Sequence, residues 1–265
     1  MNDRDDHGSL LVEVDSERGV ATLTLNRPDR RNALDAALVD HLRSALADLS
    51  QRDDVRVLVL RGAGPDFCAG ADLREVRASI DAGVMTSLAD ARSLGDLFID
   101  MRRHPMPIVA AVHGRALAGG CGLASACDLV VATDVAEFGY PEVRSGCVPA
   151  MVIALLRRSL GEKGAMELAV LGRPFDASEA HRLGLVNRVW PEASFEAECA
   201  AFVDDLAGAS GSAVRLTKQL LYQTDGAAFE SAIAAGAQVN ALARLTDDCR
   251  AGIDGFLNRP SRRSE

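Results

Sequence analysis

A run of glycines in the middle of the chain, LAGGCGLASACDLV at residues 117–130, stands where a helix begins. Glycine costs roughly 1 kcal/mol relative to alanine inside a helix, so a bare backbone here indicates that another group approaches it closely. A second glycine-rich stretch, GAGPDFCAGADL at 62–73, also links a strand-like segment to a helix-like one. Two such loops can each direct a backbone N–H at one oxygen, with a helix dipole behind it. The pattern predicts an oxyanion hole for an enolate or a tetrahedral anion.

Such a reaction also needs an acid or a base near the hole, and Glu142 is the best candidate. It lies in FGYPEVRSGCVP (138–149), between Pro141 and Gly146. This segment follows a predicted buried strand and does not read as a solvated helix face. The alternative is that Glu142 is a surface charge, the commoner role of a loop glutamate.

Other chemistries fit the sequence less well. Ser125 stands where the third glycine of a G-x-G-x-x-G fingerprint belongs, and the chain has no P-loop and no G-x-S-x-G motif. Cys121 at a helix start and His113 at a strand end could act as nucleophile and base, but structural roles are favoured. The six cysteines and five histidines show no metal-ligand spacing, so no metal site is expected.

Composition narrows the class of protein. The chain has 265 residues, a net charge of −9 and only 4% aromatic residues, which argues against a nucleic-acid partner. Its polar N-terminus has no apolar signal segment, and no apolar run is long enough to span a bilayer. Together with the scattered cysteines, these features predict a cytoplasmic protein with reduced thiols and no membrane partner.

Alternating strands and helices must position the candidate groups. Strands are predicted at 10–15, 19–26, 55–62, 107–114, 128–134 and 185–190. Helices are predicted at 34–46, 73–80, 87–103, 119–126, 149–161 and 162–172. A further helix is predicted after Asp176, which would cap it together with Glu179. Residues 194–257 are predicted to be helical, with interruptions at Gly208, Gly211, Gly226 and Gly255. Strand, helix, strand in that order predicts a right-handed crossover and a parallel sheet, whose carboxyl edge collects ligands.

Four motifs, in this order, resemble the crotonase superfamily of enoyl-CoA hydratases and isomerases. They are LNRPDRRNAL (25–34), FCAGADL (67–73), HGRALAGGCGLASACDLVVATDVAEFGYPEV (113–143) and FDASEAHRLGLVNRV (175–189). The resemblance covers roughly residues 10–257. It implies an α/β fold, a crotonase-like spiral of repeated ββα units over 1–195, and a helical C-terminal region over 196–265 that makes trimer contacts. A homotrimer or a dimer of trimers is therefore expected.

The resemblance also implies a substrate and a site. The substrate would be an acyl-CoA thioester, whose coenzyme A belongs to the substrate, so no separate cofactor is expected. The backbone N–H groups of Ala71 and Gly119 would form the oxyanion hole. The residues implied in substrate and CoA binding are Arg30, Arg31, Ala33, Ala69, Asp72, Leu73, Leu117, Gly120 and Gly122. Arg27 and Arg74 are two further arginines that could offset the anionic nucleotide.

The catalytic pair is where the chain departs from the resemblance. Relatives with two glutamates hold a water between two carboxylates; the second corresponds to Glu142, but the first corresponds to Gly122. A positioned acid or base contributes about 10² to 10⁴ in rate, so its loss bears directly on the reaction. Hydration of a 2-enoyl-CoA, in fatty-acid or branched-chain amino-acid catabolism, is the leading prediction, because the PEVR segment (141–144) resembles branched-chain hydratases of the 3-methylglutaconyl-CoA type.

Two further expectations concern the missing side chain at residue 122. A substrate carboxylate or another side chain would complete the site, and the lost bulk would leave room for a branched acyl group. The alternatives are an isomerase that moves a proton from C2 to C4 with Glu142 alone, and a non-catalytic acyl-CoA-binding protein. A nucleotide-dependent oxidoreductase is the least favoured.

Overall fold

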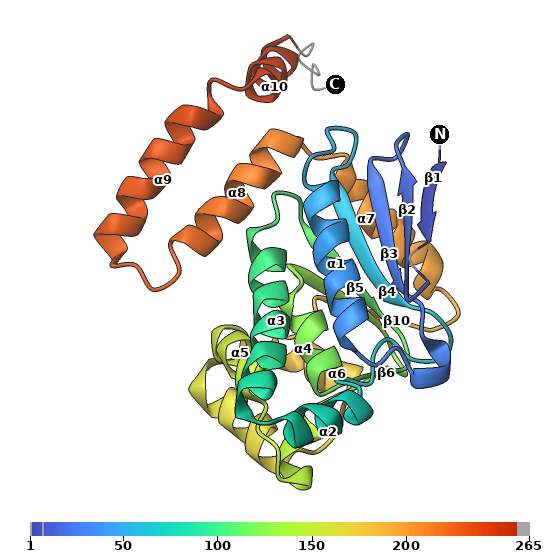
Figure 1. The fold of residues 1–265 in the computed structure, drawn as a ribbon. Helices are drawn as coiled ribbons and strands as arrows, with labels where there is room; N and C mark the ends of the chain where they lie inside the picture. Colours follow the sequence, from blue (N-terminus) through green and yellow to red (C-terminus); the bar gives the residue numbers. More distant parts are fainter. Residues whose placement is uncertain (1, 7, 259–265) are drawn as a thin grey trace.

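The computed structural model describes residues 2–6 and 8–258, and within them a twisted sheet forms the centre of the molecule (Figure 1). Its strand order is β1-β2-β3-β4-β5-β7-β10. The strands are β1 (Asn2–Asp6), β2 (Leu10–Asp15), β3 (Val20–Leu25), β4 (Val57–Gly62), β5 (Ile108–Val112), β7 (Leu129–Thr133) and β10 (Arg188–Trp190). The first three pair antiparallel and the others pair parallel, which confirms the predicted crossover and all six predicted strands. Strand β1 was not predicted.

Helices cover both faces of this sheet. Leu58 and Leu60 of β4 face one apolar cluster, which includes residues of α1 (Ala36–Leu49), α3 (Val84–Arg103), α4 (Gly119–Ala126) and α5 (Ala150–Leu171). Val57 and Val59 of the same strand face a second cluster with α7 (Phe195–Ala207). Burial on both faces explains why β4 is a nearly continuous apolar run in the sequence.

Local signals mark where several helices begin and end. Asp35 caps α1 by accepting the N–H of Leu38 at 2.9 Å, and Asp176 caps α6 (Ala177–Leu183) by accepting the N–H of Glu179 at 2.8 Å. Gly83 separates α2 (Leu73–Ala82) from α3. Gly161 has φ 70° and ψ 177° inside α5, so the two helices predicted there are confirmed as two segments around a break.

A small second sheet was not predicted from the sequence. It joins β6 (Arg115–Leu117), β8 (Glu137–Gly139) and β9 (Phe175–Asp176) in that order. Strands of two or three residues carry too little periodicity to be recognised in a single sequence. This sheet nevertheless positions the site described below.

The C-terminal part is helical, as predicted. After α7 come α8 (Gly211–Gln223), α9 (Phe229–Ala243) and α10 (Asp247–Leu257), and α9 and α10 project from the body (Figure 1). Gly208 and Gly226 lie between helices, but Gly255 lies inside α10, so the predicted interruption at Gly255 is wrong. In the described residues no helix is long and apolar enough to cross a membrane.

Candidate active site

Four chain segments run parallel and end at one place. Ala71 pairs with Leu34, and Cys68 pairs with Ala116 of β6. Leu117 of β6 then pairs with Gly139 of β8. Because these pairings are parallel, the residues that follow them emerge on the same side. Gly119 therefore leaves β6 beside the segment that carries Glu142, and Ala71 lies on the other flank of β6.

The two predicted oxyanion amides lie close to each other, and neither is used by the fold of the described residues. Gly119 is the first residue of α4, so its N–H has no partner within the helix. In the described part of the chain neither this N–H nor that of Ala71 donates to another protein group. A Cβ atom on Gly119 would lie 3.7 Å from the Ala71 nitrogen. An oxygen between these amides would receive both hydrogen bonds and would face the positive end of α4.

The backbone is strained where it turns into α4. Ala118 has φ 51° and ψ −126°, a sparsely populated region that costs about 1–3 kcal/mol for a residue with a side chain. Its N–H donates to the carbonyl of Gly139 at 2.8 Å. Gly70 packs against this turn, since a Cβ there would lie 2.9 Å from the Ala118 Cβ. These contacts hold the two loops, and hence the two amides, in one arrangement.

Gly119 and Gly120 lack a side chain for different structural reasons. A Cβ on Gly119 would meet no atom closer than 3.7 Å, so its missing side chain leaves space next to the hole. A Cβ on Gly120 would lie 2.2 Å from the carbonyl oxygen of Cys68. Ligand access is therefore the wrong explanation for Gly120, which is required by close backbone packing.

Glu142 lies in a short 3-10 helix, η2 (Pro141–Ser145), directly after β8. Its side chain is half-buried, and among the described residues its Oε2 atom is buried with no hydrogen-bond partner. Burial raises the pKa of Glu142 above its usual value of 4.5. A half-buried carboxyl group with one unpaired oxygen and a pKa raised by burial is suited to exchange a proton with a substrate.

The position of the missing acid is filled by apolar side chains. Gly122 is buried in α4, and a Cβ there would lie 2.3 Å from Cγ1 of Val152 and 3.3 Å from Cζ of Phe98. The expectation that the lost bulk leaves room for a branched acyl group is therefore wrong. Among the described residues, neither neighbour nearest this position is an acid.

The segment predicted to hold CoA is anchored to the core by a buried asparagine. Asn32 is 0% exposed and its side-chain amide donates to the carbonyls of Ala63 and Asp66, both at 2.8 Å. Its Oδ1 accepts the N–H of Arg27 at 2.9 Å. Arg31 and Asn32 both have positive φ, which asparagine tolerates well. Asn32 was not among the predicted residues, although asparagine is one of the non-glycine residues most often found with positive φ.

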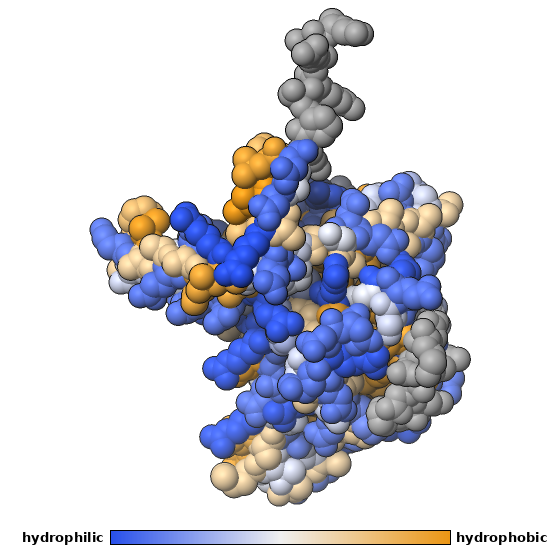
Figure 2. Space-filling model, turned by 90° about the horizontal axis from the view of Figure 1, so that it is seen from above, coloured by the Kyte–Doolittle hydropathy of each residue, from blue (hydrophilic) through white to orange (hydrophobic). Residues whose placement is uncertain are grey.

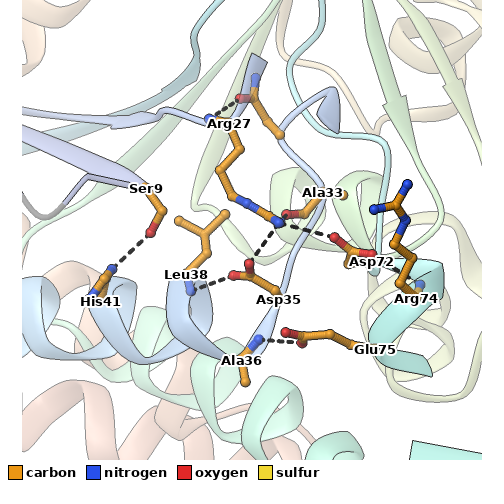
Figure 3. Close-up of polar contacts among 11 residues, drawn as sticks. Ser9, Arg27, Ala33, Asp35, Ala36, Leu38, His41, Asp72, Arg74 and Glu75 are labelled. Carbon is orange, nitrogen blue, oxygen red and sulfur yellow. Dashed lines mark hydrogen bonds and ion pairs between the residues drawn. The ribbon is translucent and has the colours of Figure 1, made fainter. Parts of the chain in front are cut away.

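The arginines nearby divide into two groups. Arg27 lies between two carboxylates, 2.8 Å from Asp35 and 3.1 Å from Asp72, and also donates to the carbonyl of Ala33 (Figure 3). Its charge is thereby neutralised within the fold. Arg30 and Arg31 are exposed; the Arg31 side chain is 60% exposed and lies 4.0 Å from Asp66. Exposed arginines remain available to an anionic ligand.

The remaining predicted binding residues also lie along this edge. Ala69 donates to the carbonyl of Arg31 at 2.9 Å, and Leu117 donates to that of Cys68 at 3.0 Å. Asp72 begins α2 by accepting the N–H of Arg74 at 3.1 Å, so its carboxylate serves this cap and Arg27. Leu73 is 78% exposed beside it. The fold thus places these predicted residues along the same edge of the molecule. The carboxylate of Asp72, however, is used to cap α2 and to bind Arg27.

The alternative nucleophile is inert. Cys121 is fully buried, and burial raises the pKa of its thiol to about 12. His113 contacts the carbonyl of Gly64 at 2.8 Å. Both residues have the structural roles that were favoured. Across residues 2–6 and 8–258, no three His, Cys, Asp or Glu side chains cluster as a metal site would require.

Comparisons with known proteins agree with this geometry. Residues 15–263 match the family described as Enoyl-CoA hydratase/isomerase. A Thermus thermophilus protein named "Putative enoyl-CoA hydratase" is 42% identical, over 95% of this chain and 100% of its own. The 2,3-dehydroadipyl-CoA hydratase of Escherichia coli is 34% identical over 93% and 95% of the two chains. The crystal structure of an enoyl-CoA hydratase from Mycobacterium smegmatis has a TM-score of 0.91 and 36% identity, covering 95% and 96% of the two chains.

The chain belongs to the enoyl-CoA hydratase/isomerase family. The crotonase-like α/β fold expected from the four motifs is confirmed. Sequence reasoning missed three buried residues that support the candidate site by packing or hydrogen bonding: Asn32, Phe98 and Val152. Only Asn32 lies within a motif; the other two approach Gly122 from distant helices, and no local pattern marks them.

Proposed function

We propose that this family member hydrates a 2-enoyl-CoA. The CoA part lies along residues 27–34 and 69–73, where exposed Arg30 and Arg31 offset its negative charge. The thioester oxygen accepts hydrogen bonds from the N–H groups of Ala71 and Gly119. No cofactor is needed beyond the CoA of the substrate.

One carboxylate performs both proton transfers in this proposal. Glu142 takes a proton from water as the water oxygen bonds to C3, and the electrons of the C2=C3 bond move into the enolate held by the two amides. Glu142 then returns the proton to C2, so water has been added across the double bond. Burial raises the pKa of Glu142, which makes its carboxylate a stronger base for the first transfer.

The observation that carries this proposal is that the amide of Gly119 and the carboxylate of Glu142 both follow directly after two paired strands. Leu117 and Gly139 are paired in adjacent parallel strands, and Gly119 and Glu142 follow them by two and three residues. The Ala118–Gly139 hydrogen bond of 2.8 Å keeps the two turns together. Two free amides beside a half-buried carboxylate with one unpaired oxygen suit enolate chemistry on a thioester.

Substitution of Glu142 by glutamine tests the proposal. Glu142→Gln is expected to lower kcat on 2-enoyl-CoA substrates by about 10² to 10⁴, because glutamine cannot accept the proton. Its thermal unfolding at pH 7 is expected at or above the wild-type temperature, since burial disfavours only the charged form. A folded variant with wild-type turnover would refute the role of Glu142.

An enoyl-CoA isomerase is the second candidate, favoured by the apolar surroundings of Gly122. Moving a proton from C2 to C4 needs one base and no water. Crotonyl-CoA, 3-hexenoyl-CoA and 3-methylglutaconyl-CoA, each followed by mass spectrometry, separate the candidates: a gain of 18 mass units identifies hydration, whereas isomerisation leaves the mass unchanged. Binding of all three without turnover would favour a non-catalytic acyl-CoA-binding protein.

We also propose a homotrimer or a dimer of trimers assembled through the C-terminal helices. Large hydrophobic side chains are exposed on α8–α10, including Leu221 at 65% and Phe229 at 75% (Figure 2). An isolated soluble domain rarely exposes so many, which supports burial between copies of the chain. We further propose a cytoplasmic location, supported by six cysteines that are all free thiols.

A further inference from the structure

The packing around Gly122 connects the two halves of the site. Helix α4 begins with the hole amide of Gly119, and α5 follows directly after the segment of Glu142. These helices pack against each other, and α3 contacts both. The two helices are so close at residue 122 that a Cβ atom added to Gly122 would lie only 2.3 Å from Cγ1 of Val152. Val152 and Phe98 are 3% and 4% exposed, so this wall is closed.

In the proposed function, the acyl group extends from the oxyanion hole along α4, and its reach can be compared with the position of this wall. Residue 122 is three residues beyond Gly119, which is about 4.5 Å along a helix. When the carbonyl oxygen is held at Gly119, a substituent on C3 lies three bonds from the carbonyl carbon, which is a comparable reach. A substituent on C3 that turns toward α4 therefore meets Val152 and not an open pocket.

We propose that Val152 is a specificity-determining residue that selects thioesters with no branch at C3. This inference rests on the proposed function, because the acyl group must be placed by the oxyanion hole. Gly122 and Val152 are sterically complementary. Because residue 122 has no side chain, a methyl group of Val152 can occupy the space beside it and form the wall. Straight-chain 2-enoyl-CoA is the substrate class that fits.

The kinetic test compares wild type with Val152→Ala. Turnover of crotonyl-CoA and 3-methylcrotonyl-CoA is measured, and the variant is expected to shift the ratio of kcat/KM values toward the 3-methyl substrate by about 10-fold or more. Ile153→Ala is the matched control, since Ile153 is the adjacent residue of α5 and is 38% exposed. It is expected to leave the ratio unchanged.

A binding test separates this inference from the reaction. The affinities of butyryl-CoA and 3-methylbutyryl-CoA for the same three proteins are measured by calorimetry, and only Val152→Ala is expected to gain preference for the branched thioester. If the proteins bind these thioesters but turn over no enoyl-CoA, the proposed function fails. The ratio of the affinities for 3-methylbutyryl-CoA and butyryl-CoA still decides whether Val152 selects against a branch at C3. An unchanged ratio in both assays, or no binding of either thioester, overturns it.

A stability cycle tests the contact itself. Gly122→Ala is expected to lower the unfolding temperature of the wild type because its Cβ meets Val152. The same change in a Val152→Ala background is expected to cost less, since the obstructing Cγ1 atom is gone. Equal losses in both backgrounds would show that the two residues are uncoupled and would overturn the inference.

Discussion

Glu142 is half-buried, and in the described residues its Oε2 atom has no partner; this burial sets how the proposed reaction responds to pH. Its pKa is raised by burial above 4.5, and the proposed reaction needs the deprotonated form. We expect kcat/KM to fall on the acid side with a midpoint above 4.5. A pH–rate profile on a 2-enoyl-CoA measures this, and Glu137→Gln is the control, because Glu137 lies in β8 outside the proposed site.

The sign of this dependence follows from the shift. Above the raised pKa the carboxylate is charged and active; as pH falls through that pKa the base is lost. The same group weakens folding as pH rises through its folded pKa, because the unfolded chain releases the proton at a lower pH. An acid limb centred at or below 4.5 would contradict the assigned environment of Glu142.

Gly119 and Gly120 make a matched pair of alanine substitutions. Gly119→Ala is expected to fold normally but to lower kcat/KM by about 10² to 10³, because its Cβ would enter the space beside the Ala71 amide. Gly120→Ala is expected to destabilise the fold, since its Cβ would lie 2.2 Å from a carbonyl oxygen. Thermal melts and steady-state kinetics on both variants separate the effects. Wild-type activity of Gly119→Ala would argue against a hole at this amide.

At the scale of elements, a buried ion pair attaches α8 to the body. Lys218 is 7% exposed; its Nζ donates to Asp128 at 2.7 Å and to the carbonyls of Met101 and Met106 at 3.1 and 3.0 Å. Tyr222, one turn later, donates to the same carboxylate at 2.7 Å. Thus α8 holds the end of α3 and the start of β7 with charged groups, before the projecting helices begin.

Removing this lysine tests the attachment. Lys218→Met is expected to lower the free energy of unfolding by about 3–5 kcal/mol, because it leaves the charge of Asp128 buried without its cation. The only other lysine of the chain, Lys163, is exposed and provides the control. Lys163→Met is expected to change stability by less than about 0.5 kcal/mol. Equal chemical denaturation curves for both variants would show that the ion pair does not hold α8.

At the scale of the whole molecule, the projecting helices are expected to be covered by other copies of the chain. We expect light scattering to give a mass of three or six times the 28.0 kDa of one chain. Phe229→Glu combined with Ile233→Glu is expected to reduce it, because these residues of α9 are 75% and 59% exposed and apolar. Gln238→Glu adds charge to the same helix as a control. A monomeric wild type would contradict the proposed assembly.

Much of this organisation could be read from the sequence. Apolar periodicity identified six strands of the main sheet and the helices around it, because burial on one or both faces leaves a regular trace along the chain. Motifs at 25–34, 67–73, 113–143 and 175–189 pointed to the family. The bare backbone at Gly119 and the loop position of Glu142 indicated the hole and the base, since both depend on local chain geometry.

The rest depended on contacts between residues far apart in the sequence. Only the folded chain shows that a Cβ on Gly120 would clash with Cys68, that Asp35 and Asp72 neutralise Arg27, and that Val152 fills the space at Gly122. The sequence determined the family and indicated the parts of the candidate site, because both depend on local patterns of residues. The tertiary structure decided what replaces the missing side chain at 122, because steric fit exists only between elements that folding brings together.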